Sequence, residues 1–115
     1  MNGKFTESTQ TLLQSAQNEA LRRDHQELRP EHLLFALFDE NSPVAPVVEL
    51  AGGSVAGLRT KSADLVSRIP QVRGGSGNLY PSGHLSRLMV QAEDEAKRLG
   101  DSYVAPEHLL LALLS

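Results

Sequence analysis

Apolar residues recur at steps of three and four along most of the chain, which is the spacing of one face of an α-helix. Residues 6–23 show this pattern first, with glutamine, asparagine and glutamate side chains on the opposite face. Thr6 is a suitable helix cap, and Glu7 follows in the first turn, where the helix dipole favours an anion. The segment predicts a first helix whose buried face comprises Leu12, Leu13, Ala16, Ala20 and Leu21.

Proline and glycine delimit the second and third predicted helices. Pro30 begins the second, because its fixed φ and missing N–H suit the first helical position. That helix ends before Asn41-Ser42-Pro43, and a short third helix over residues 45–51 ends at Gly52-Gly53. The buried face predicted for the second helix is Leu33, Leu34, Leu37 and Phe38.

Three more helices complete the prediction of an all-α fold. Ser54 and Ser82 are caps for a fourth and a fifth helix, and Pro106 begins a sixth. Residues 71–81 contain several glycines and no sustained period, so they are predicted to form an exposed loop. No segment alternates at period two, as a half-buried strand would. The predicted inner positions are Leu58, Leu65, Val66 and Ile69 in the fourth helix and Leu85, Leu88, Met89, Ala92, Ala96 and Leu99 in the fifth.

The chain contains an internal repeat with an offset of 76 residues. The motif Pro-Glu-His-Leu-Leu at residues 30–34 recurs at residues 106–110, and the register holds without a gap across the preceding helix and turn. Small positions stay small and core positions stay apolar, as duplication of a packing unit requires. We therefore predict one domain over residues 1–115, with a first repeat at about 5–69, a linker at 70–81 and a second repeat at about 82–115.

The second repeat is predicted to be truncated, because it has two helices where the first has four. Its last helix carries an apolar stripe at Leu109, Leu110, Leu113 and Leu114 that needs a cover. We therefore expect the chain to be a fragment of a longer protein.

Composition narrows the class of protein. Aromatic residues make up only 4% of the chain, so the core must be built from leucine, valine and alanine. The net charge of −3 is too small to indicate binding to nucleic acid or to a membrane surface. Cysteine is absent, and no stretch resembles a signal peptide or a membrane span, so we expect a soluble cytoplasmic protein.

The polar residues do not assemble into a recognisable catalytic or metal centre. His32 and His108 occupy equivalent positions and are interpreted as helix-start residues, because no His-Glu-x-x-His motif supplies metal ligands at helical spacing. The glycines at 74–77 lack the Gly-Lys-Ser/Thr step and the helix of a phosphate loop. No setting presents an activated serine nucleophile. The prediction is a binding module that is not an enzyme and holds no cofactor or metal.

The repeated motif, the Leu-Gly-Asp-Ser-Tyr-Val turn at 99–104 and the Arg-Ile-Pro-Gln-Val step at 68–72 resemble the Clp amino-terminal domain, which precedes the ATPase rings of AAA+ unfoldases. The resemblance covers essentially the whole chain. The Ile-Pro-Gln-Val step and the loop at 75–79 are closer to the ClpB branch, the disaggregases, than to ClpC or ClpA. The resemblance implies a pseudo-two-fold bundle of eight helices that is flexibly tethered to a ring. The ring is expected to be hexameric and to use ATP and magnesium.

The resemblance also implies partners and site residues. A ClpB-like domain would dock unfolded or aggregated polypeptide and pass it to the ring, which works with a cooperating chaperone system. A ClpC- or ClpA-like domain would instead bind an adaptor protein. Polar positions for substrate handling are matched by Thr6, Asp101 and Glu107, and an apolar groove at the fifth and sixth helices would include Met89 and His108.

Simpler interpretations of three of these residues remain open. Asp101 is also suited to capping the preceding turn, and Glu107 to the dipole of the sixth helix. Met89 fits the core on periodicity alone, and a groove role requires that it be partly exposed.

Overall fold

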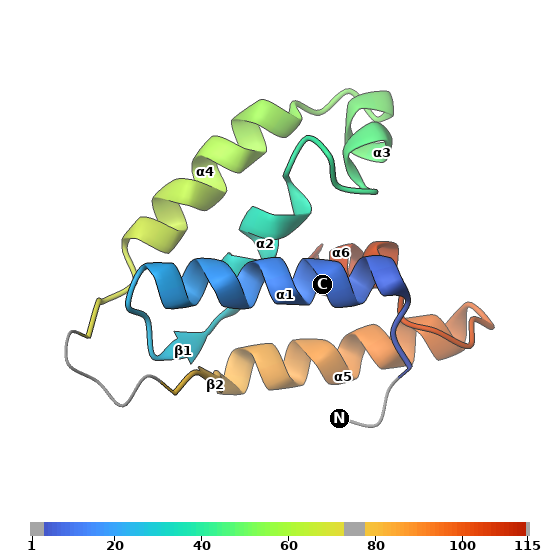
Figure 1. Ribbon diagram of the computed structural model, residues 1–115. Helices are drawn as coiled ribbons and strands as arrows, with labels where there is room; N and C mark the ends of the chain where they lie inside the picture. Colours follow the sequence, from blue (N-terminus) through green and yellow to red (C-terminus); the bar gives the residue numbers. More distant parts are fainter. Residues whose placement is uncertain (1–3, 73–77, 115) are drawn as a thin grey trace.

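The computed structural model describes residues 4–72 and 78–114, and within these residues the predicted all-α fold is confirmed (Figure 1). The glycine-rich loop at 73–77, on which part of the family resemblance and the rejected phosphate loop rest, lies outside the described residues. The elements are α1 (Glu7–Arg22), β1 (Glu27–Leu28), α2 (Pro30–Leu37), α3 (Ala45–Leu50), α4 (Val55–Ser67), β2 (Tyr80–Pro81), α5 (Gly83–Arg98) and α6 (Pro106–Leu114).

Three of the predicted capping residues begin their helices. The side chain of Thr6 accepts a hydrogen bond from the backbone of Thr9, and Ser54 and Ser82 do the same for α4 and α5. Each cap satisfies one of the backbone N–H groups that a helix start leaves without a partner. Pro30 and Pro106 stand at the first positions of α2 and α6, as their spacing predicts.

The long helices α1 and α5 lie side by side and run in opposite directions (Figure 1). Helix α2 packs on α1 and α4, and α6 packs on α5, so each long helix has a short partner from its own repeat. The largest fully buried apolar side chains are Leu33, Leu37, Met89, Leu109 and Val66.

Three leucines predicted to be buried are exposed instead. Leu21, Leu65 and Leu99 expose 48%, 41% and 52% of their surface. Leu99 is the C-cap of α5, and Leu21 lies in the last turn of α1, so both side chains stand at the ends of their helices. Helical spacing identifies which side of a helix is apolar, but the partner helix decides how far along that side the burial extends.

The segment just before the long helix of each repeat is hydrogen-bonded to the other repeat. The backbone N–H of Thr6 donates to the carbonyl of Val104 over 3.1 Å, and the N–H of Ser82 donates to Leu28 over 2.9 Å. These two bonds are related by the offset of 76 residues. Around Ser82 the pairing extends to the parallel strands β1 and β2, so residues 80 and 81, predicted to be in a loop, form a short strand. Around Thr6 the pairing is the bridge between Phe5 and Val104.

The turn after each long helix also repeats. Asp24 and Gly100 both have positive φ, 59° and 77°, and each is the residue before a matched bond. The N–H of His25 donates to Ala20 over 3.0 Å, and that of Asp101 donates to Ala96 over 2.8 Å. Duplication is therefore visible in the hydrogen bonds as well as in the sequence, and it places His25 and Asp101 at equivalent points.

Candidate functional site

An apolar groove of about 430 Å³ lies between α1 and α5. Its walls come from four parts of the chain: α1, the first half of α5, the segment around β2, and Leu28 of β1. The residues that line it are Leu13, Gln17, Leu21, Leu28, Asn78, Leu79, Pro81, Leu85, Ser86 and Met89. All ten are uncharged, in a chain in which 22% of residues are charged.

The groove combines an exposed rim with a buried floor. Leu21 exposes 48% of its surface at the rim, whereas Met89 and Leu85 are buried and complete the floor from α5. Gln17, Asn78 and Ser86 add polar side chains along the walls. An apolar recess edged by amides and a hydroxyl suits a segment of polypeptide, which presents apolar side chains together with backbone polar groups.

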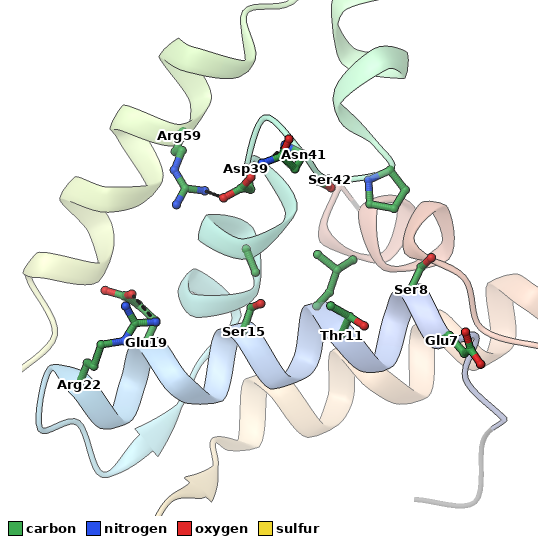
Figure 2. A pocket seen from close by; sticks show the side chains of 13 residues that line it. Glu7, Ser8, Thr11, Ser15, Glu19, Arg22, Asp39, Asn41, Ser42 and Arg59 are labelled. Carbon is green, nitrogen blue, oxygen red and sulfur yellow. Dashed lines mark hydrogen bonds and ion pairs between the residues drawn. The ribbon is translucent and has the colours of Figure 1, made fainter.

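A larger, polar cleft of about 680 Å³ lies on the other side of α1, facing the α2–α3 connection and α4 (Figure 2). Its charged side chains are mostly engaged with one another. Arg59 lies 3.2 Å from the carboxylate of Asp39, and Arg22 lies 3.7 Å from Glu19. Arg59 also donates to the carbonyl of Phe35 and lies over its ring, 4.1 Å from the centroid. These contacts tie α4 to α2, so the cleft is best explained as structural.

The five residues predicted to bind substrate fall in two places. Thr6, Asp101, Glu107 and His108 gather where the leading segment of α1 meets the turn before α6, because Thr6 is bonded to Val104 within that turn. Met89 lies apart from them, at the floor of the groove. The structure brings four of the predicted residues together and separates the fifth.

The predicted position of the groove, at the fifth and sixth helices, is wrong in part. Helix α5 contributes to the groove, but its partner is α1, and none of the residues lining the groove comes from α6. His108 is 2% exposed and does not line it. Met89 is 1% exposed, so the partial exposure that a groove role requires is not met and it contributes only to the floor. Helix α6 instead packs its His108 face into the core, which is why that face is not available to a ligand.

The carboxylate of Asp101 accepts a hydrogen bond from His108. The Nδ1 of His108 accepts from the N–H of Ala105 over 2.8 Å, so the ring proton of the neutral imidazole is on Nε2. That Nε2 lies 2.8 Å from Oδ2 of Asp101. Asp101 thus positions His108, and His108 in turn binds the backbone at the start of α6. Glu107 is exposed in the first turn of the same helix.

The first repeat has a different partner at the equivalent place, and sequence reasoning missed it. His32 Nδ1 accepts from the N–H of Arg29 over 2.9 Å, and its Nε2 lies 2.8 Å from Nδ1 of His25. His25 and His32 are both buried. The signal that identifies this pair was present, because the offset of 76 residues places His25 on Asp101.

Both histidines of this pair resist protonation. Burial, and after it the neighbouring His25, lowers the pKa of His32 to about 4. Burial also lowers the pKa of His25 below its ordinary value, and the guanidinium of Arg23 acts in the same direction. Removing a charged imidazole from water and placing it near other positive charge disfavours the charged form. The pair is therefore neutral at pH 7.

Across residues 4–72 and 78–114, no three side chains of His, Cys, Asp or Glu converge as a metal site would require. Within the same residues, each helix is too short or too polar to cross a lipid bilayer.

Comparison with known sequences identifies relatives across the whole domain. The model of the family described as "Clp repeat (R) N-terminal domain" matches residues 4–115. The chaperone protein ClpB of Rhizobium meliloti (strain 1021) is 41% identical over 111 residues, which are 96% of this chain and 13% of that protein. ClpB of Vibrio cholerae serotype O1 (strain ATCC 39315 / El Tor Inaba N16961) is 36% identical over 112 residues, with the same two shares. The chain thus spans only a small part of the length of these relatives.

Solved structures share the fold. The Hsp104 N-terminal domain from Candida albicans superposes with a TM-score of 0.89 at 24% identity, over 97% of this chain and 74% of that one. The ClpV N-domain in complex with a VipB peptide superposes with a TM-score of 0.82 at 26% identity, over 96% of this chain and 68% of that one.

Proposed function

Because the chain belongs to the Clp repeat N-terminal domain family, we propose that it is the substrate-docking domain of a ClpB-like ATP-dependent disaggregase. It would bind unfolded or aggregated polypeptide and pass it to an ATPase ring, expected to be hexameric and to work with a partner chaperone system in the cytoplasm. In this proposal the domain itself is not catalytic. ATP and magnesium belong to the ring.

The apolar groove is the observation that supports this proposal. It combines an exposed leucine rim, a buried floor and an uncharged lining, which suits the apolar segments that unfolded chains expose and folded proteins bury. Such binding is weak and reversible for one segment, and tethering to a ring would raise the local concentration of the client. Thr6, Asp101 and Glu107 remain predicted substrate contacts at a second place on the surface.

A second candidate is the recognition of one adaptor protein, as predicted for ClpC- or ClpA-like relatives. The ClpV N-domain solved with a VipB peptide favours it, because a domain of this fold there holds a peptide of one defined protein. A pull-down separates the two functions. One folded partner at fixed stoichiometry supports the adaptor, and many unfolded clients support docking.

Titration of the isotopically labelled chain with casein, followed by NMR, tests the docking function. We expect the largest shifts at the amides of Leu13, Leu21, Leu79 and Leu85. Leu21→Glu places a charge on the exposed rim and should weaken binding about tenfold, since burying a leucine contributes roughly 1.5–3 kcal/mol. Met89 is unsuitable for this test, because a charge at a buried position would disrupt the core.

Leu50→Glu is the matched control. Leu50 is 91% exposed in α3 and does not line the groove, so the same substitution there should leave casein affinity unchanged. Equal loss of binding in the two variants, or shifts confined to α3 and α4, would contradict docking in the groove.

A further inference from the structure

The segment between His25 and His32 supports one wall of the apolar groove. The carbonyl of Gln26 accepts from the N–H of Tyr80 over 3.0 Å, and the carbonyl of Leu28 accepts from the N–H of Ser82 over 2.9 Å. Leu28 also lines the groove itself. The wall formed by Leu79 and Pro81 is therefore positioned by the backbone of β1.

His25 and His32 stand at the two ends of this segment and connect it to neighbouring parts of the chain. A chain of hydrogen bonds runs from the N–H of Arg29 to Nδ1 of His32, and from Nε2 of His32 to Nδ1 of His25. The backbone of Ile69, just after α4, accepts from the His25 ring. The chain thus connects the turn after α1, the start of α2 and the end of α4 through two buried rings.

Only neutral rings complete this chain. His32 accepts at Nδ1 and donates at Nε2, and His25 accepts at Nδ1. A proton added to either Nδ1 sets a donor against a donor and breaks one bond. The charged groups facing the pair are Arg23 and Arg29, which oppose a further positive charge, and Glu19 on α1, which favours it. Glu19 is already bound to Arg23, and Arg68 on α4 is bound to Asp64.

In the second repeat, the bond between His108 and Asp101, which matches the bond between His32 and His25, does not require a neutral histidine. Asp101 stands where His25 stands, and a carboxylate accepts from Nε2 of His108 whether that histidine is neutral or charged. The backbone bond equivalent to that of Ser82 runs from the N–H of Thr6 to the carbonyl of Val104, over 3.1 Å, and in the same pairing the N–H of Val104 donates to Lys4 over 2.7 Å. The amides of Thr6 and Val104 therefore serve as an internal control for the amides of Tyr80 and Ser82.

We propose that the His25–His32 pair is an acid-sensitive clamp on the apolar groove. Protonation of either ring releases β1, the wall at residues 79–81 loses its support, and binding of polypeptide weakens. The effect on binding rests on the proposed docking function, but the release of the wall does not.

Amide hydrogen exchange of the intact chain at pH 7 and pH 5 tests the clamp. After correction for intrinsic exchange, the Tyr80 and Ser82 amides should lose about tenfold or more of their protection at pH 5, since an exposed imidazole titrates near 6.5. The Thr6 and Val104 amides should change less than twofold. Equal responses of the two pairs of amides would overturn the clamp.

Two variants and a binding measurement complete the test. His25→Asp copies the Asp101–His108 pair and should make the two pairs of amides respond alike. His25→Asn, which keeps an acceptor that does not titrate, should show a smaller differential loss than the wild type. Casein affinity should fall about tenfold from pH 7 to pH 5 in the wild type and less than twofold in His25→Asp. A loss of protection with no casein bound at either pH would support the clamp and overturn the docking function.

Discussion

His108 donates from Nε2 to the carboxylate of Asp101 over 2.8 Å, at the position where the first repeat joins two imidazoles. The repeats share the backbone of the turn, the proline and the histidine that accepts from the residue before it. They differ in the group that accepts from Nε2 of this histidine, which is an imidazole in the first repeat and a carboxylate in the second. One half of the domain is therefore held by a charged acceptor, and the other is held by a neutral pair that acid disrupts.

Stability should decrease as the pH falls from about 6.5 to 5. The unfolded chain binds a proton at His32 near pH 6.5, whereas the folded chain does so only at about pH 4, so protons favour unfolding between these values. One such group contributes a slope of about 1.4 kcal/mol per pH unit, or roughly 2 kcal/mol over this range. Urea denaturation at several pH values measures it.

His32→Gln provides the comparison for that slope. The variant should be less stable at pH 7, because the buried chain of hydrogen bonds is broken, but its stability should vary less with pH. His84→Gln, at an exposed histidine in the first turn of α5, should retain the wild-type slope. An unchanged slope in His32→Gln would contradict the assignment.

Thr6→Ala and Ser82→Ala should each reduce the free energy of unfolding by about 1 kcal/mol, because each removes the oxygen that caps a 16-residue helix. The two positions are equivalent by the repeat, so their structural costs should match in urea denaturation. Only Thr6 is a predicted substrate contact. If Thr6→Ala and Ser82→Ala bind casein equally well, Thr6 is a capping residue alone.

Gly100→Ala and Gly57→Ala should have opposite effects on stability. Gly100 has a φ of 77° with no atom within 4 Å of an added Cβ, so alanine there costs about 1 kcal/mol of backbone strain and nothing from steric contact. Gly57 lies within α4, and its added Cβ would make only ordinary contacts. Alanine at that position should stabilise the chain by up to ~1 kcal/mol, measured by thermal unfolding.

Leu33→Ala and Leu109→Ala should each cost about 2–5 kcal/mol, because both leucines are fully buried in the same core. Similar losses would show that the two repeats contribute comparably to one cooperative unit. Leu50→Ala, at the exposed leucine of α3, should change stability by less than about 0.5 kcal/mol. A transition that splits in two for either core variant would show that the repeats unfold separately.

The sequence by itself determined the helices, their caps and the register of the repeat. These features depend on neighbours within a few residues: Thr6 caps the helix that follows it, and Pro30 begins the helix in which it lies. The offset of 76 residues even specified that His25 and Asp101 are equivalent. Local backbone geometry and apolar spacing are sufficient to encode all of this.

Only the tertiary structure decided which of these parts meet. The bonds from Thr6 to Val104 and from Ser82 to Leu28 join segments far apart in the chain, and helical spacing carries no information about such pairs. Because α1 lies beside α5, Leu21 forms the rim of a groove rather than part of the core, and Met89 forms its floor. The exposure of an apolar residue depends on the helix that covers it, and that helix is set by packing across the whole domain.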